Sequence, residues 1–240
     1  MAFKKIILVG LLSILTSLAQ ANQKPSSDYY LQLNLGYAHG LKPKGDFAQG
    51  NMGDTGLYGL ELGYRINKNF RTSLSLDYRP NFKNSYSTST NEPTPHLGVI
   101  QKDATAIESY HTKVKSLVAM LNVYYDITQV SNFTPYLTLG VGVASNKTSS
   151  SMNATHALLG YNKTTDYIKA TNNSFAYKVG LGSRYSVNNS VELDLRYQYV
   201  DLGRFKTGAS VSCNGNYINE AAKNGKLKAH EFILGLVYKF

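Results

Sequence analysis

The residues of this sequence that could perform acid–base or metal chemistry are few and scattered. The five histidines are His39, His96, His111, His156 and His230. None of them shows the spacing from other ligand residues that a metal site requires. The sequence also lacks a Gly-x-Ser-x-Gly nucleophile elbow and a glycine-rich phosphate loop. We therefore expect a protein that is not an enzyme and that holds no cofactor and no metal.

A second set of ionisable residues is more regular, because its members alternate with apolar residues along several short segments. The acidic members are Glu61, Asp77, Asp126, Glu192, Asp194 and Glu231. The basic members are Arg65, Arg71, Arg79, Lys178, Arg184, Arg196 and Lys239. If these side chains share one enclosed space, opposite charges should pair, since an unpaired buried charge costs several kcal/mol. We interpret them as a polar network that fills an interior.

A third set is a basic cluster near the end of the chain. Between positions 203 and 228 five cationic residues accompany a single acidic one, Glu220. The five are Arg204, Lys206, Lys223, Lys226 and Lys228. Such a cluster could bind the phosphates of lipopolysaccharide or acidic host glycans. The alternative is a solvated surface that binds nothing.

The elements that must position these residues are strands. Apolar or aromatic residues occupy every second position in eight segments: 29–37, 58–66, 70–78, 117–125, 133–143, 175–185, 191–199 and 232–240. The last segment shows the pattern with Phe232, Leu234, Leu236, Tyr238 and Phe240. Side chains alternate between the two faces of a strand, so one face of each segment is apolar. About ten residues per segment suffice to span the apolar band of roughly 25 Å in a membrane barrel.

The connections between the segments alternate in length. Three are short: 67–69, 127–132 and the Asn188-Asn189 turn; four are long: 39–56, 80–113, 145–173 and 203–228. This order predicts an all-β fold, an eight-stranded antiparallel up-and-down transmembrane β-barrel with short periplasmic turns and four long extracellular loops. An interior of this size is filled by side chains. A lipocalin would place apolar residues inside and polar residues outside, which is the reverse of this pattern.

The first 21 residues have the features of a secretory signal. Lys4 and Lys5 precede an apolar run, and Ala19-Gln20-Ala21 has the small-x-small form of a cleavage site. We predict a cleaved signal peptide at 1–21 and a barrel domain at 22–240. No later stretch is long and apolar enough for a membrane helix. The single cysteine, Cys213, has no second cysteine with which to form an internal disulfide.

Three stretches carry a resemblance to a known family: Tyr197–Gly203, Tyr136–Val143 and Phe232–Phe240. They resemble membrane strands of the small outer-membrane β-barrel surface antigens, the group of opacity proteins and OmpA-like transmembrane barrels. The resemblance implies a location in the bacterial outer membrane. The final strand, with its terminal phenylalanine, is similar to the signal that directs such proteins to the barrel-assembly machinery. Several members of the group are adhesins, including rickettsial-type surface proteins.

These observations favour an integral outer-membrane surface protein that contributes to envelope integrity and whose extracellular loops bind host or matrix components. The expected partners are outer-membrane lipid and lipopolysaccharide, the assembly machinery, and host surface proteins or glycans. Nucleic acid is not expected, because the sequence offers no stacking platform. A narrow channel for ions or small solutes is the alternative. A lipid A-modifying enzyme that uses His39 or His230 near the barrel rim is the less favoured possibility.

Overall fold

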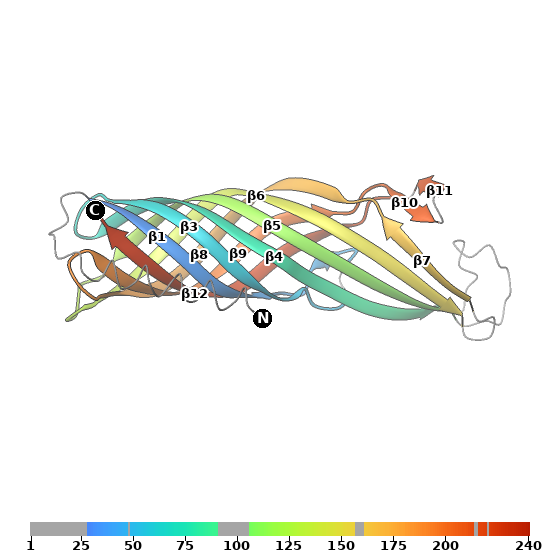
Figure 1. Ribbon diagram of the computed structural model, residues 1–240, viewed down its shortest axis with the longest axis horizontal. Helices are drawn as coiled ribbons and strands as arrows, with labels where there is room; N and C mark the ends of the chain where they lie inside the picture. Colours follow the sequence, from blue (N-terminus) through green and yellow to red (C-terminus); the bar gives the residue numbers. More distant parts are fainter. Residues whose placement is uncertain (1–27, 48, 91–105, 157–160, 214–215, 220) are drawn as a thin grey trace, which may run out of the picture.

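The computed structural model describes residues 28–47, 49–90, 106–156, 161–213, 216–219 and 221–240, and the predicted signal peptide lies outside them. Eight long antiparallel strands form the body of the molecule (Figure 1). They are β1 (Tyr29–Gly40), β3 (Gly53–Arg65), β4 (Phe70–Thr90), β5 (Ala106–Asp126), β6 (Phe133–His156), β8 (Ala170–Ser186), β9 (Val191–Lys206) and β12 (Asn224–Lys239).

Each of these eight strands pairs with the next one along the chain, and one further pairing, of the last strand with the first, closes the ring. The first strand, β1, pairs with the last, β12, from Tyr30 opposite Lys239 to Gly40 opposite Ala229. In the same way β6 pairs with β8, from Phe133 opposite Tyr185 to Thr148 opposite Ala170. A closed ring leaves no unpaired edge, which is the condition for a sheet to lie in lipid. The predicted eight-stranded barrel is confirmed.

Four shorter strands lie beyond the ring. The first, β2 (Lys44–Gly45), pairs with β12. At the end of the barrel far from the C-terminus, β7 (Tyr161–Tyr167) pairs with β6 and with β10 (Ser210–Cys213) (Figure 1). The last, β11 (Asn216–Asn219), pairs with β10. Cys213 thus lies on a distal strand, opposite Asn216.

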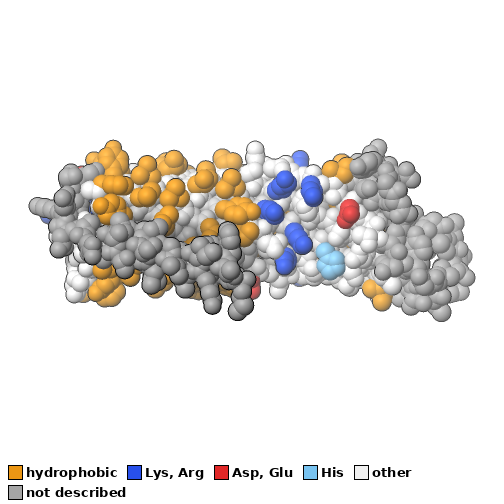
Figure 2. All heavy atoms as spheres, viewed as in Figure 1, with side chains coloured by type: hydrophobic (Ala, Val, Ile, Leu, Met, Phe, Trp, Pro, Cys, Tyr) orange, Lys and Arg blue, Asp and Glu red, His pale blue; other side chains and the backbone are white. Residues whose placement is uncertain are grey.

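The predicted apolar faces point out of the barrel. Leu74, Leu139 and Leu195 are each more than 60% exposed, and the other strands show the same outward phase. These side chains form a belt around one half of the molecule (Figure 2). One residue of the predicted set, Val191, is instead buried at 4% exposure, opposite Tyr238 in the register.

Asparagine side chains close two of the three short turns, as expected. The Asn67 side-chain oxygen accepts hydrogen bonds of 2.9 Å from the backbone N–H groups of Asn69 and Phe70. At the equivalent turn before β9, Asn188 accepts from Ser190 and Val191 at 2.9 and 2.8 Å. These contacts satisfy N–H groups that the tight turn leaves without a ladder partner.

The long connections differ from the prediction, because much of their length is strand. Both β4 and β5 have 21 residues and β6 has 24, so they extend well into the segments 80–113 and 145–173 that we predicted as loops. Side chains continue to alternate between inward and outward there, but the outward side chains are mostly polar and apolar side chains point inward. Residues such as Phe82, Val114 and Ala144 point inward and are fully buried, while lysines and serines point outward. A prediction based on apolar residues at every second outward position therefore does not identify these parts of the strands.

The barrel therefore contains two different interiors. Below, within the apolar belt, the inward side chains are mostly charged or polar. Above them lies a continuous apolar cluster contributed by β1, β4, β5, β6, β8, β9, β12 and the segment before β3. Phe47 from that segment packs against Phe205 with a centroid distance of 5.0 Å. We call the second region, above the belt, the extracellular extension.

Candidate functional sites in the interior and on the outer face

The polar interior is built from charged pairs, some of which join adjacent strands while others lie across the barrel. Arg79 on β4 donates from Nε and Nη2 to the two carboxylate oxygens of Glu231 on β12, at 2.5 and 2.9 Å. Gln198 on β9 also donates to this carboxylate, at 2.6 Å. All three side chains are at most 1% exposed. A bidentate pair of this kind joins strands that are distant in the sequence and fixes both side chains.

A second bidentate pair lies nearer the short turns. Arg71 donates from Nε and Nη2 to the two oxygens of Asp126, at 2.7 Å each. Its guanidinium carbon also lies 4.6 Å from the ring centroid of Tyr124 and 5.1 Å from that of Tyr136. The two rings meet edge to face at 5.4 Å. The aromatic faces supply further favourable contact for a cation that has lost its water.

Two more arginines complete the network. Arg196 donates to the hydroxyl of Tyr124, which donates in turn to Glu61, at 2.8 Å each. Arg184 donates to Gln32 at 2.9 Å and lies 3.4 Å from Glu192 and 3.5 Å from Asp194. Further contacts of the network are those of Arg196 with Glu61 at 3.6 Å, of Tyr136 with Asp194 at 2.7 Å and of Lys239 with Glu192 at 2.9 Å.

Three predicted members of the network have no opposite charge within ion-pair distance in the described part of the chain: Arg65, Asp77 and Lys178. Arg65 is only half-buried and lies opposite Arg71 in the register. Asp77 and Lys178 are 2% exposed, so the expectation that enclosed charges pair does not extend to them. Asp77 accepts a long hydrogen bond of 3.5 Å from Ser75.

The prediction omitted the uncharged residues that connect the pairs: Tyr30, Gln32, Tyr124, Tyr136 and Gln198. A signal for one of them is present in the sequence. Tyr30 lies over Gly63, where a Cβ atom would collide with its ring. Glycine at an inward position of one strand thus makes room for a large side chain from the next strand.

Most charged side chains of the interior are engaged with one another. The paired acids contact arginines, a lysine and tyrosines, and above them lies the apolar cluster, whose side chains are at most 2% exposed. These contacts join strands on different sides of the barrel and so help to hold the strands together.

The five residues of the predicted basic cluster lie in three different environments. Lys226 and Lys228 are on β12 and contact the buried carboxylate of Asp201, at 2.9 and 3.7 Å. Lys223 lies 4.6 Å from the ring centroid of Tyr110 and 5.3 Å from that of Tyr167. Burial and a hydrogen bond to Glu108 raise the pKa of Tyr110, so its phenol stays neutral.

The other two, Arg204 and Lys206, are exposed on the outer face of β9. Gly203 has a φ of 74° and would collide with Ser174 if it carried a side chain. The next carbonyl, that of Arg204, accepts hydrogen bonds from Asn146, Asn172 and Ser174 at 3.0, 3.0 and 3.1 Å. This irregular backbone is thereby fixed, and it holds a free guanidinium outward.

The histidines of the described region do not form a catalytic constellation. His39 contacts Asp54 at 2.6 Å, and this hydrogen bond lowers the pKa of Asp54. His111 contacts the hydroxyl of Ser85 at 3.0 Å. A serine hydrolase with a catalytic triad needs the hydroxyl, the base and the orienting acid in one chain of hydrogen bonds. Here the acid and the hydroxyl contact different histidines. His230 instead contacts Tyr197 at 2.8 Å, while His96 and the side chain of His156 lie outside what the structure describes.

Metal sites and membrane-spanning helices are absent from the part of the chain that the structure describes. No group of three or more histidine, cysteine or carboxylate side chains could hold a metal ion there. No helix there is long and apolar enough to cross a membrane.

A closed ring of strands with an apolar belt outside and paired charges inside defines an integral membrane β-barrel. The sequence model of the outer membrane protein beta-barrel domain family matches residues 7–240, and the chain belongs to this family. It is a protein of the bacterial outer membrane, as the sequence predicted.

Curated relatives and a solved structure are similar to this chain over most of its length. The chain is 28% identical to the outer membrane protein PagN of Salmonella typhimurium over 189 residues, which is 76% of this chain and 72% of that protein. It is 29% identical to a putative adhesin of Rickettsia felis over 226 residues, which is 88% of this chain and 92% of the other. The crystal structure of Neisserial surface protein A aligns with a TM-score of 0.44 and 21% identity, covering 89% of this chain and 98% of that one.

Proposed function

We propose that this protein is a non-enzymatic surface adhesin, whose extracellular extension presents a cationic face to acidic components of host cells or matrix. The observation that carries the proposal is the extension itself. Its strands continue past the lipid belt around an apolar core, so it is a rigid body that stands above the membrane. The barrel does not need these residues to span the bilayer, but it needs them to project a binding surface beyond the bilayer.

Within this surface, Arg204 and Lys206 are the favoured contacts. Both side chains are exposed, and neither has a carboxylate within ion-pair distance among the described residues. Lys226 and Lys228, which we also predicted, are partly neutralised by Asp201. Lys223 is engaged by two tyrosine rings. A sulfated or carboxylated glycan could form bidentate contacts with the exposed guanidinium of Arg204. The name of the Rickettsia felis relative supports the same activity.

The experiment uses the full chain displayed on bacteria that do not themselves adhere to cultured host cells. We expect the displayed protein to confer adhesion that soluble heparin inhibits, because a sulfated polymer competes for the same cations. The R204Q/K206Q variant should lose about tenfold in adhesion, since each charged contact contributes on the order of 1 kcal/mol.

The matched control is K68Q, which removes an exposed lysine from the short turn at the opposite end of the barrel. This variant should adhere as well as the parent protein. Equal adhesion by R204Q/K206Q and the parent, at equal surface amounts, would refute the role of these two residues. No adhesion by the parent protein would refute the function.

We also propose that the outward residues of β12 form the signal for the assembly machinery. Phe232 and Leu234 are each 56% exposed on the lipid face, and Tyr238 meets Phe240 edge to face at 5.4 Å. The Y238A/F240A variant should leave less folded protein in the outer membrane at the same level of synthesis. Unchanged amounts, measured by heat-dependent migration in gels, would contradict this role.

A further inference from the structure

A group of lysines lies on the outer face of the barrel directly above the apolar belt, on strands that the basic cluster at 203–228 does not include. The four are Lys83, Lys113, Lys115 and Lys147, which we call the lysine platform, and all are exposed. Figure 2 shows lysine and arginine side chains gathered where the belt of apolar side chains ends. The platform belongs to β4, β5 and β6, whereas Arg204 and Lys206 belong to β9.

The register places like charges directly opposite one another. Lys83 on β4 faces Lys113 on β5, and Lys115 on β5 faces Lys147 on β6. Side chains paired in this way have Cβ atoms about 5 Å apart, and Lys113 and Lys115 are about 7 Å apart along one face of a strand. Facing charges of the same sign destabilise a sheet. An anion from outside the protein that binds between two such neighbouring pairs would therefore stabilise them.

No protein carboxylate supplies that charge in the part of the chain that the structure describes. None of the four lysines has an acidic partner within ion-pair distance there. The outward positions around them carry Ser85, His111, Ser145 and Ser149. Two outward acids of this region do not pair with the platform. Asp54 contacts His39, and Asp166 lies on a different strand, β7, opposite Ser151. The contrast with β12 is direct, since Lys226 and Lys228 share Asp201.

The height of the platform identifies the anion. Leu117 is the last outward residue of the apolar belt on β5, and Lys115 and Lys113 follow it on the same face. With a strand tilt near 40°, they stand about 5 and 10 Å above Leu117 along the barrel axis. The polar head groups occupy roughly 5–8 Å on each side of a bilayer. The lysines thus reach the level at which the phosphates of membrane lipids lie.

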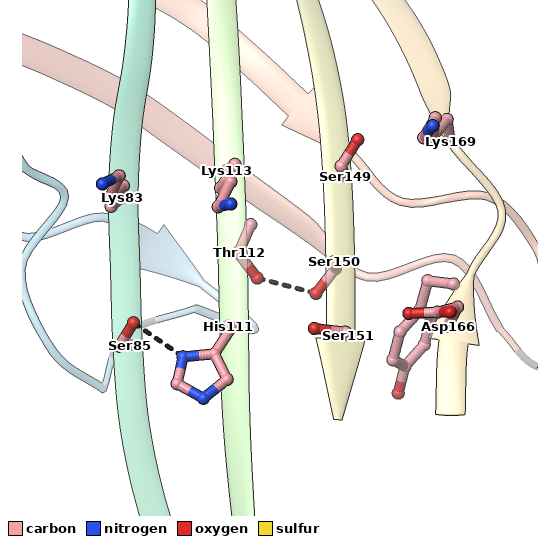
Figure 3. Close-up of a pocket in the computed structure, with 11 residues that line it drawn as sticks. Lys83, Ser85, His111, Thr112, Lys113, Ser149, Ser150, Ser151, Asp166 and Lys169 are labelled. Atoms are coloured by element: carbon pink, nitrogen blue, oxygen red, sulfur yellow. Dashed lines mark hydrogen bonds between the residues drawn. The ribbon is translucent and has the colours of Figure 1, made fainter. Parts of the chain in front are cut away.

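Above the platform there is room for the sugar of a glycolipid. A cleft of about 640 Å³ begins at Lys83 and Lys113 and is also lined by Lys169, His111 and Asp166. Figure 3 shows Lys83 and Lys113 side by side on adjacent strands, with the Ser85–His111 hydrogen bond further along the same strands. The hydroxyls of Ser149 and Ser151 line the cleft as well and could bind sugar hydroxyls.

We propose that the lysine platform binds the phosphorylated sugar head group of a glycolipid in the outer leaflet of the protein's own membrane. Binding at this site anchors the barrel in the outer leaflet and sets the height of the extracellular extension above the membrane. This inference depends on the membrane location and not on adhesion, since it involves other strands and another partner.

The test uses the full barrel, refolded into nanodiscs of phosphatidylcholine that contain bisphosphorylated lipid A or lipid A from which both phosphates have been removed. Native mass spectrometry after release in mild detergent counts the lipid A molecules that stay bound. We expect the parent protein to retain bisphosphorylated lipid A. The K83Q/K113Q/K115Q/K147Q variant should bind it about 600-fold more weakly, because each of the four lysines at a membrane surface contributes on the order of a factor of five.

Two matched variants separate a site from a general charge effect. K42Q/K44Q/R204Q/K206Q removes four exposed cations from the β2 and β9 side of the extension and should retain lipid A. K83R/K113R/K115R/K147R keeps the charge on the platform and should also retain it, which shows that loss in the glutamine variant is not caused by misfolding. Far-ultraviolet circular dichroism and heat-dependent gel migration confirm the barrel in each variant.

Three results would overturn the proposal. The first is equal retention of bisphosphorylated lipid A by the parent and the platform glutamine variant. The second is equal retention of the phosphate-free lipid by the parent, which would assign binding to the acyl chains. The third is an equal loss of lipid A binding in K42Q/K44Q/R204Q/K206Q, which would show that the effect depends on net charge and not on the platform. Heparin in solution at the same anion concentration should not displace the lipid; displacement would point to a soluble host glycan as the ligand.

Discussion

The lower and upper halves of the same strand, β5, show how the two regions of the barrel differ. From Leu117 to Tyr125 the outward residues are apolar, and the inward residues change from Val118 and Met120 to Asn122 and Tyr124. From His111 to Lys115 the outward residues are polar or charged, and the buried inward residues are Thr112 and Val114. The phase of the strand never changes. What changes between the two halves is the chemistry of the faces.

This change shows that ring closure and side-chain chemistry are separate requirements. Backbone hydrogen bonds close the ring in both halves, so either face can be apolar. In the lower half lipid surrounds the ring, and the interior can be polar only because arginine–carboxylate pairs satisfy one another. In the upper half water surrounds the ring, and an ordinary apolar core serves. The lower interior should therefore be intolerant of single charge removals.

The largest effect should come from removing one partner of the most buried pair. Arg79→Ala leaves the Glu231 carboxylate buried without its cation and should destabilise the folded barrel by about 3–5 kcal/mol. Urea unfolding in lipid vesicles, followed by tyrosine fluorescence or by heat-dependent gel migration, measures the loss. The double variant R79L/E231L should recover most of it, because neither charge is then left alone. A loss in R79A below 1 kcal/mol would show that water reaches the lower interior.

The outward faces should respond to charge in opposite ways. Leu121→Lys places a cation in the middle of the lipid belt on β5 and should cost about 2–4 kcal/mol. His111→Lys changes the same face of the same strand in the extension and should stay within about 0.5 kcal/mol, since water surrounds it. The same unfolding assay compares both. Equal losses of stability at the two positions would contradict the boundary between the lower half, which lipid surrounds, and the upper half, which water surrounds.

The sequence predicts the lower half of the fold because lipid imposes one rule there. Outward apolar positions with a period of two identify all eight strands, and the asparagines of two short turns lie where the pattern stops. It does not predict the upper half, because Phe82, Val114 and Ala144 alternate with lysines and serines on the opposite face. Their pattern is that of a soluble sheet, and short stretches of it within polar segments resemble loops.

The sites divide in the same way. The inward charges follow from the strand phase alone, but their partners do not, because Arg79 and Glu231 are 152 positions apart and only the register of the closed ring brings them together. Tyr124 and Tyr136 have apolar bodies, so their part in a polar network could not be read from residue type. The lysine platform was missed because Lys83, Lys113 and Lys147 lie in two segments that we predicted as separate loops, and Lys115 lies between the first of these and the next predicted strand.

A smaller difference should appear between two valines on β5. Val114 is fully buried in the core of the extension, whereas Val123 is 47% exposed on the lipid face. Val114→Ala should destabilise the barrel by about 2 kcal/mol, the loss of two buried carbon atoms together with the cavity that they leave. Val123→Ala should cost less than about 1 kcal/mol, because lipid chains fill the space. A larger loss at Val123 would mean that lipid packs against the belt as tightly as protein packs in the core.

The smallest expected signal is the conductance of the barrel, which should be indistinguishable from that of a protein-free bilayer. The polar network alone could pass small ions, but Phe82, Phe205 and Leu227 lie above it in a core that excludes water. Arg196→Ala changes the network and leaves this apolar layer intact, so it too should show no discrete steps in planar-bilayer recordings. Steps in the parent protein whose size changes in R196A would show that ions pass both regions, and the upper core would then be a gate and not a seal.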